Sequence, residues 1–164
     1  MKLVVAVDQE WGIGNKGDLL ARVRADLLHF KELTLGKTVI LGSNTLATFP
    51  GGKPLKNRRN LVLSADLSFR PKGAEVFRSE AELRALLHTL DQELLCVIGG
   101  ESIYRQMLPY CDVAHVTKID HAYEADAYFP DLDSDPEWEI TADSDEQVYF
   151  DITYQFLKYE RNKS

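Results

Sequence analysis

Asp26 is the residue whose type and position most require a chemical explanation. It lies in RADLLHFKEL, residues 24–33, where a helix would place it on the same face as Phe30 and Leu33, with Leu27 beside them. We expect this apolar face to be buried, and burial would raise the pKa of the carboxyl because desolvation disfavours its charged form. Two interpretations stay open on these residues alone. Asp26 either acts on a ligand in a pocket, or it is a first-turn acid that the helix dipole stabilises by about 0.3 to 1 kcal/mol.

Glycines follow two of the apolar runs and point to a second kind of chemistry. Gly42-Ser43-Asn44-Thr45 comes after TVIL, and Gly99-Gly100 comes after LLCVI. Each places backbone amides and a helix start at the carboxyl edge of a sheet, where open α/β sheets bind ligands. Either one alone is better explained as a tight turn in which glycine supplies a positive φ. Two on the same edge favour a ligand that contains a diphosphate.

Gly12, Gly14 and Gly17 form the pattern G-x-G-x-x-G, which is typical of dinucleotide-binding folds. In that motif the first glycine comes almost directly off a strand, whereas here residues 8–11 intervene and two of them are acidic. We therefore predict a flexible, glycine-rich loop over residues 9–23 that lies across the carboxyl end of the sheet.

The elements that must position these residues alternate between strand and helix. Short apolar runs rich in β-branched residues predict strands buried on both faces, at residues 3–7, 38–41, 60–63, 75–77 and 94–98. Helical patterns lie at residues 25–35, 79–90 and 101–108. Ser79 and Glu82 fit an S-x-x-E capping box at the start of the second helix. This order predicts an α/β fold with a mostly parallel twisted sheet and helices on both faces.

The C-terminal part has a different pattern. Residues 113–119 and 151–160 alternate apolar and polar positions with no helix between them, which predicts an antiparallel pair that closes one edge of the sheet. Residues 50–60, PGGKPLKNRRN, are typical of a surface loop. We expect residues 1–164 to form a single domain.

Bulk composition excludes several classes of partner. The 164 residues include 19 Lys plus Arg and 26 Asp plus Glu, a net charge of −7 that disfavours nucleic acid and anionic membranes. The N-terminal apolar run is too short for a signal peptide, and no later run approaches a membrane span, so we expect a cytoplasmic protein. Cys96 and Cys111 have no partner at metal-ligand spacing. We expect both cysteines to be structural and expect no metal site.

Five segments together resemble the dihydrofolate reductase family. They are GIGNKGDLL, RADLLHFKELTLGKTVILG, PGGKPLKNRRNLVLS, VIGGESIY and TKID…DAYFPD, in this order over essentially the whole chain. The resemblance implies the single-domain fold of that family. It also implies NADPH-dependent reduction of 7,8-dihydrofolate to 5,6,7,8-tetrahydrofolate, a step of one-carbon metabolism, by hydride transfer from nicotinamide to the pterin.

The resemblance gives Asp26 a role as the acid that accepts hydrogen bonds from the pterin and promotes its protonation. Arg58 would bind the glutamate carboxylate of folate, and Thr117 would hydrogen-bond to the acid. The full set implied for substrate binding is Val5, Leu19, Leu20, Asp26, Leu27, Phe30, Phe49, Leu55, Arg58 and Thr117.

For the cofactor, the resemblance implies a second set of residues. Ala6, Ile13 and Gly14 would lie near the nicotinamide, and Ser64 and Arg78 near the adenosine. The whole set is Ala6, Ile13, Gly14, Asn15, Leu19, Gly42, Ser43, Asn44, Thr45, Ser64, Arg78, Ile98, Gly99, Gly100, Glu101, Ser102, Ile103 and Tyr104. A cis peptide is implied between Gly99 and Gly100, and Asp126 would support the glycine-rich loop.

Three departures from the family pattern affect these expectations. Leu20-Ala21 stands where many members have Pro-Trp, so proton delivery would be organised differently. Ser43 and Ser102 stand where basic residues commonly contact cofactor phosphates, which bears on the choice between NADPH and NADH. Two alternatives remain: a noncatalytic folate- or nucleotide-binding protein, or a related reductase that acts on a pyrimidine of riboflavin synthesis. We expect a monomer.

Overall fold

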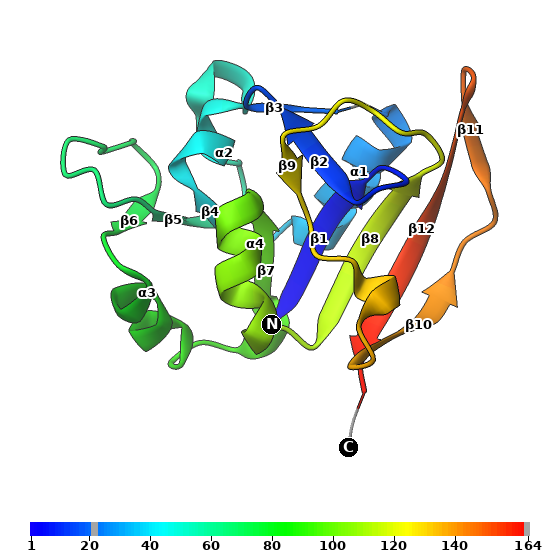
Figure 1. The fold of residues 1–164 in the computed structure, drawn as a ribbon. Helices are drawn as coiled ribbons and strands as arrows, with labels where there is room; N and C mark the ends of the chain where they lie inside the picture. The colour runs from blue at the N-terminus through cyan, green and yellow to red at the C-terminus, as the bar shows by residue number, and fades with distance from the viewer. Residues whose placement is uncertain (21–22, 163–164) are drawn as a thin grey trace.

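A central sheet of nine strands organises the molecule, and its strand order is β10-β12-β8-β1-β7-β4-β5-β6, with β11 paired to β12 (Figure 1). The structure is a computed structural model that describes residues 1–20 and 23–162. Strands β1, β7, β4, β5, β6 and β8 run parallel, and β12 is antiparallel to β8. The predicted α/β class with a mostly parallel sheet is therefore confirmed.

The parallel strands fall where the apolar runs predict them. Their bounds are β1 Lys2–Val7, β4 Thr38–Gly42, β5 Arg59–Leu63, β6 Glu75–Phe77 and β7 Leu95–Gly99. Because consecutive side chains point to opposite faces, each strand contributes to two cores. In β4, Ile40 packs on one face, while Val39 and Leu41 pack on the other.

Helices cover both faces of this sheet, as predicted. Their bounds are α1 Arg24–Thr34, α2 Ser43–Ala47, α3 Glu80–Leu87 and α4 Glu101–Met107. The face that carries Ile40 also receives residues of α3 and α4, and the opposite face receives residues of α1 and α2 (Figure 1). The capping prediction is confirmed, because the Ser79 hydroxyl accepts the Glu82 N–H at 3.2 Å.

The antiparallel side of the sheet is wider than the sequence suggested. The predicted pair forms, as β8 Val113–Ile119 and β12 Ile152–Arg161. The edge of the sheet, however, is β10 Trp138–Asp143, which pairs with β12, as does β11 Gln147–Tyr149. These two strands were not predicted. In β10 the apolar residues Trp138, Ile140 and Ala142 do alternate with polar ones, but this signal was overlooked, and β11 is only three residues long.

The glycine-rich segment is not the irregular loop that we expected over residues 9–23. It contains β2 Gly12–Asn15 and β3 Asp18–Leu19, which form a small antiparallel sheet with β9 Ala127–Tyr128. Glycine has no side chain to mark a strand face, so these short strands leave no pattern in the sequence. A strand rather than a helix follows the first glycine, in keeping with the rejection of the dinucleotide-fold motif. Ala21 lies outside the described residues.

Four short 3-10 helices complete the described chain: η1 Pro50–Gly52, η2 Gln92–Leu94, η3 Leu108–Tyr110 and η4 Leu132–Ser134. Cys96 and Cys111 are buried free thiols, as predicted for structural cysteines. Within residues 1–20 and 23–162, the structure has no helix long and apolar enough to span a bilayer.

Candidate active site

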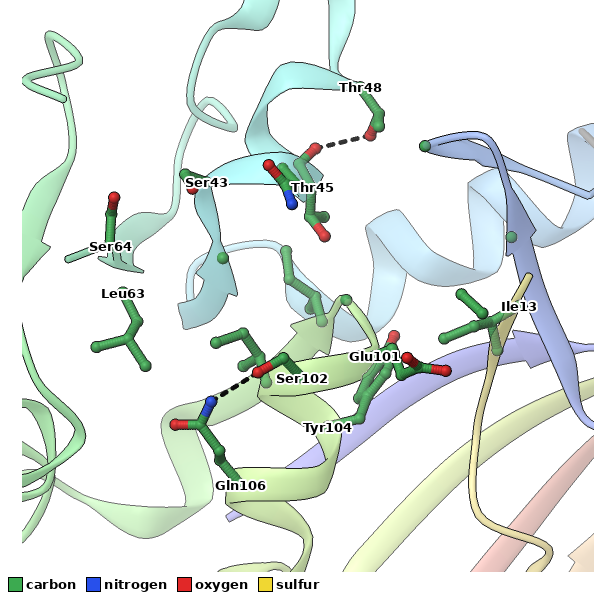
Figure 2. A pocket seen from close by; sticks show the side chains of 18 of the residues that line it. Ile13, Ser43, Thr45, Thr48, Leu63, Ser64, Glu101, Ser102, Tyr104 and Gln106 are labelled. Atoms are coloured by element: carbon green, nitrogen blue, oxygen red, sulfur yellow. Dashed lines mark hydrogen bonds between the residues drawn. The ribbon is translucent and has the colours of Figure 1, made fainter. Parts of the chain in front are cut away.

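A cavity of about 700 Å³ opens at the carboxyl ends of β1, β4, β5 and β7 (Figure 2). Parallel strands of an open α/β sheet end at the same edge, and ligands bind there. Fifteen predicted cofactor residues line the cavity: Ala6, Ile13, Gly14, Gly42, Ser43, Asn44, Thr45, Ser64, Arg78, Ile98, Gly100, Glu101, Ser102, Ile103 and Tyr104. Asn15 and Gly99 are not among the lining residues, and the side chain of Leu19 lies outside what the structure describes.

The turn between β7 and α4 brings backbone close to the cavity. The Gly99–Gly100 peptide is cis, as the resemblance implied. Gly99 has φ +117°, and a Cβ there would lie 3.1 Å from the ring of Tyr104, so only glycine suits this position. A Cβ on Gly100 would lie 3.1 Å from the Thr45 hydroxyl. The two glycines thus let the turn after β7 pass close to Tyr104 and Thr45, and Gly100 lines the cavity without a side chain.

Tyr104 connects this cavity with the region around Asp26. Its hydroxyl donates to the carbonyl of Val4 at 2.7 Å. Burial raises the pKa of Tyr104 far above its usual range, and the negative charge of Asp26 raises this pKa further. Tyr104 thus lines the cavity and is affected by the charge of Asp26, which is not itself among the lining residues.

Asp26 itself is half-buried in the first turn of α1. The hydroxyl of Thr117, on β8 and only 3% exposed, donates to its Oδ1 at 2.5 Å. Desolvation raises the pKa of Asp26, while the Thr117 hydrogen bond and the nearby His29 lower it. The first of these effects is the largest, so the carboxyl is easier to protonate than an exposed aspartate. The predicted pairing of Asp26 with Thr117 and the predicted direction of the pKa shift are both present.

The apolar residues expected near Asp26 divide into two groups. Phe30, Phe49 and Leu55 are partly buried against a core cluster of β4, α2, β5 and β7 residues, namely Val39, Leu41, Leu46, Val62, Cys96 and Ile98. Leu20 is also partly buried. Leu27, by contrast, is 44% exposed, and of the eleven residues of α1, all described, Thr34 alone is buried. The expectation of a buried face on α1 is therefore wrong, because this helix turns only part of that face toward the sheet.

Arg58 lies at the other end of α1. Its guanidinium donates to the Thr34 hydroxyl at 3.1 Å and to the Lys56 carbonyl at 2.9 Å, and partial burial lowers its pKa. Thr34 follows Asp26 by eight positions, which is about 12 Å along the helix axis at a rise of 1.5 Å per residue. An acid and a base thus occupy opposite ends of one helix.

Asn60, only 2% exposed, organises the segment that carries Leu55 and Arg58. Its side chain accepts the Leu55 N–H at 3.0 Å and donates to the carbonyls of Leu55 and Arg58, each at 2.9 Å. Residues 50–60 were predicted to be a surface loop that meets a strand at residue 60, and in the structure that strand, β5, begins one residue earlier, at Arg59. An asparagine at the start of an apolar run was the signal in the sequence for this role.

Two carboxylates hold the small sheet next to the cavity. Asp126 accepts the N–H of Lys16 at 2.9 Å, in line with its expected support of the glycine-rich segment. Asp8, which we did not predict, is 1% exposed and accepts the N–H groups of Glu10, Gly12 and Tyr123 at 2.8 to 3.0 Å. Its position directly after β1 was the only signal in the sequence.

Several lining residues also escaped prediction. They come from loops, strand ends and helices around the cavity: Gly17, Thr48, Leu63, Ala65, Ser79, Glu80, Gln106 and Ala127. Val5, which was predicted for the substrate, lines this cavity as well, whereas the other predicted substrate residues whose side chains the structure describes do not. The described part of the chain holds no group of three or more His, Cys, Asp or Glu arranged to bind a metal ion.

An open α/β sheet with a glycine-floored cavity at its carboxyl edge, and a desolvated carboxyl beside it, defines an enzyme that binds a nucleotide. The dihydrofolate reductase family model matches residues 1–161. The chain belongs to the dihydrofolate reductase family.

Individual relatives agree with the family model. The dihydrofolate reductase of Staphylococcus haemolyticus is 34% identical over 98% of this chain and 95% of its own length, and that of Bacillus subtilis strain 168 is 32% identical over 100% and 96%. The dihydrofolate reductase of Enterococcus faecalis, solved with NADP(H) and RAB-propyl, is similar with a TM-score of 0.87 and 30% identity over 99% of this chain and 96% of that one. These relatives do not favour the pyrimidine reductase or the noncatalytic binding protein.

Proposed function

We propose that this chain reduces 7,8-dihydrofolate to 5,6,7,8-tetrahydrofolate with NADPH, and that Asp26 orients the pterin and promotes its protonation. One observation carries the assignment of Asp26. The carboxyl is desolvated and has a raised pKa, and Thr117 is the one side chain among the described residues that donates a hydrogen bond to it. Its charge also raises the pKa of Tyr104, which lines the cavity. The carboxyl therefore retains lone pairs for a ligand's N–H donors, and it accepts a proton more easily than an exposed aspartate.

The cavity residues fit a dinucleotide. The volume of about 700 Å³ is of the size of a cofactor site, the glycines keep the floor open, and hydroxyls of Ser43, Thr45 and Ser64 line the walls. NADPH supplies the hydride when it is bound. We assign Ala6, Ile13 and Gly14 to the nicotinamide end, and the remaining lining residues of α2, β5 and α4 to the phosphates and adenosine.

On the substrate side, the roles follow the layout of α1. Asp26 holds the pterin N–H groups, Thr117 fixes the rotamer of the carboxyl, and Phe30, Phe49 and Leu55 provide apolar contact. Arg58, about 12 Å further along the helix by its rise of 1.5 Å per residue, faces the end where folate carries its glutamate carboxylate. This order suits a long substrate with a donor heterocycle at one end and an anion at the other. A pyrimidine without that anion would leave Arg58 without a ligand.

The direct test mixes purified protein, dihydrofolate and NADPH and follows the loss of reduced-nicotinamide absorbance. We expect one NADPH to be oxidised for each dihydrofolate consumed. Binding of both ligands without oxidation, at high protein concentration, would exclude the enzyme and favour a noncatalytic binding protein.

We further propose that residues 1–164 act as one domain and as a monomer, because the residues of both sites come from a single chain. Both cysteines are free and buried, which fits a reducing compartment such as the cytoplasm. Size-exclusion chromatography with light scattering tests the monomer directly.

A further inference from the structure

The cavity that we assign to the cofactor has an unusual balance of charge for a site that receives NADPH. Arg78 is the one cationic residue among the described residues that line it, whereas Glu80, Glu101 and Asp126 contribute carboxylates. NADPH differs from NADH by a single phosphate monoester, a group with a charge of roughly −1.5 to −2 at neutral pH. Sites that select NADP usually present an arginine to this phosphate.

The guanidinium of Arg78 is already engaged. One terminal nitrogen donates to the carbonyls of Ser64 and Asp66, and the other donates to the carbonyl of Phe69 at 3.0 Å. These bonds tie the segment between β5 and β6 to the start of α3. These bonds use three of the five N–H donors of the guanidinium, so Arg78 can contact a phosphate only through the donors that remain.

One carboxylate is held in place at the cavity. Glu101, at the start of α4, accepts the N–H of Tyr128 at 2.6 Å, which fixes its charge beside the Gly99–Gly100 turn. Glu80 is partly compensated by Arg84 at 3.9 Å, and Asp126 accepts the N–H of Lys16. The fixed charges of the wall therefore oppose an additional phosphate on the ligand.

The end of the cavity away from Ile13 offers neutral groups instead. Figure 2 shows Ser43 and Ser64 on one side of this end, with Ser102 and Gln106 on the other. The amide of Gln106 donates to the Ser102 hydroxyl at 2.8 Å, so these two side chains already satisfy each other in part. A hydroxyl or amide can donate to either a ribose hydroxyl or a phosphate, but unlike a cation it carries no charge to neutralise that of the phosphate.

We propose that this cavity discriminates weakly between NADPH and NADH, because neutral side chains and an engaged arginine stand where a 2′-phosphate would need a free cation. The proposal rests on the proposed function, since it assigns the cavity to a nicotinamide dinucleotide. It makes Ser102 a position that determines cofactor specificity.

The test measures dissociation constants of NADPH and NADH by calorimetry on the native chain and on two variants that add the same charge. Ser102→Arg places a guanidinium at the neutral end, and Val148→Arg places one on β11, where the side chain is 71% exposed and distant from the cavity (Figure 1). We expect the native constants to agree within about tenfold. Ser102→Arg should bind NADPH about tenfold more tightly, the worth of one charge-assisted hydrogen bond, with NADH nearly unchanged. Val148→Arg should resemble the native chain.

The proposal would be overturned if the native chain bound NADPH more than tenfold more tightly than NADH. It would also be overturned if Ser102→Arg increased the affinity for both dinucleotides equally. Turnover of dihydrofolate is measured on the same samples. If the native chain binds the two dinucleotides within tenfold of each other but does not turn over dihydrofolate, the proposed function is wrong and the weak discrimination stands. If it turns over dihydrofolate but binds NADPH much more tightly than NADH, the weak discrimination is wrong and the proposed function stands.

Discussion

Asp8, directly after β1, and Asp26, in the first turn of α1, are two carboxylates in very different surroundings. Asp8 is 1% exposed and accepts three backbone N–H groups, which join the start of the small sheet to the segment after β8. Asp26 is half-buried, and the Thr117 hydroxyl is the one side chain that donates to it among the described residues. Asp8 accepts three hydrogen bonds from the protein, whereas the desolvated carboxyl of Asp26 accepts one from a side chain and keeps lone pairs that a ligand could use.

This difference separates a structural acid from a chemical one. A carboxylate that accepts several backbone N–H groups serves the local fold, because every lone pair in use stabilises a backbone conformation. A carboxyl with few donors in an apolar setting has a raised pKa and remains available to a ligand. Four substitutions test the contrast, here in order of decreasing expected effect.

Asp26→Asn should lower kcat at neutral pH by about 100- to 10,000-fold, the usual worth of a positioned acid or base, because the amide cannot take up a proton. The fold should be retained, since Thr117 can still donate to the amide oxygen. Steady-state rates with dihydrofolate and NADPH, with circular dichroism as the control for folding, measure both. A variant that keeps more than a tenth of the native rate would remove Asp26 from the mechanism.

Asp8→Ala should lower the free energy of unfolding by roughly 3 kcal/mol, because three N–H groups lose their acceptor and an unsatisfied buried group costs about 1 to 3 kcal/mol. Asp91→Ala is the matched control. Asp91 is exposed and accepts one backbone N–H at the start of η2, so its loss should cost about 1 kcal/mol or less. Urea denaturation measures both variants. Equal losses would contradict the structural role of Asp8.

Asp26→Asn should also make the folded chain more stable than the native chain at neutral pH. Because the folded-state pKa of Asp26 is raised, the native state binds more protons than the unfolded state above roughly pH 4, the ordinary pKa of an aspartate. Native stability therefore falls as the pH rises through the folded-state pKa, and the neutral variant escapes this loss. Urea denaturation at pH 4 and at pH 7.5 measures the difference in midpoint between Asp26→Asn and the native chain, and this difference should be larger at pH 7.5. An equal difference at both pH values would mean that the pKa of Asp26 is not raised.

Thr117→Val should raise the pKa of Asp26, and His29→Gln should raise it by less. Both residues lower this pKa in the native chain, and the Thr117 hydrogen bond is the larger of the two causes. His29 lies one turn after Asp26 and stacks on Phe156 of β12 with ring centroids 4.1 Å apart. Carbon-13 NMR titration of the Asp26 carboxyl reads the shift directly. A larger shift in His29→Gln than in Thr117→Val would reverse the order of these two effects.

Among the strands predicted correctly from the sequence are those whose side chains are apolar and buried on both faces of the sheet. The buried strands β1, β4, β5 and β7 were found because residues apolar on both faces have no other stable arrangement than the middle of a sheet. The small strand β2 was missed because half of its residues are glycine, and β3, β9 and β11 were missed because two or three residues are too few to show a period. The alternation of apolar and polar residues in β10 was overlooked.

Two features of the site could not be predicted from the sequence: the exposure of Leu27 and the hydrogen bonds of Asp8. Leu27 was expected to be buried on a helix face, yet it is 44% exposed, because periodicity identifies a face but not what covers it. Asp8 was overlooked because its three donors come from residues 10, 12 and 123, and a donor more than a hundred positions away leaves no local trace.

The sequence by itself determined the fold class, the main strands, the position of Asp26 on the first long helix, and the glycine turns that leave the cavity floor open. All of these follow from local periodicity and backbone sterics. Only the tertiary structure decided that Thr117 reaches Asp26 across 91 positions of chain, that Asp8 is saturated, and that Arg78 is already engaged. The reason is physical: a pKa and a hydrogen-bond partner depend on which atoms exclude water around a group, and chain folding alone brings those atoms together.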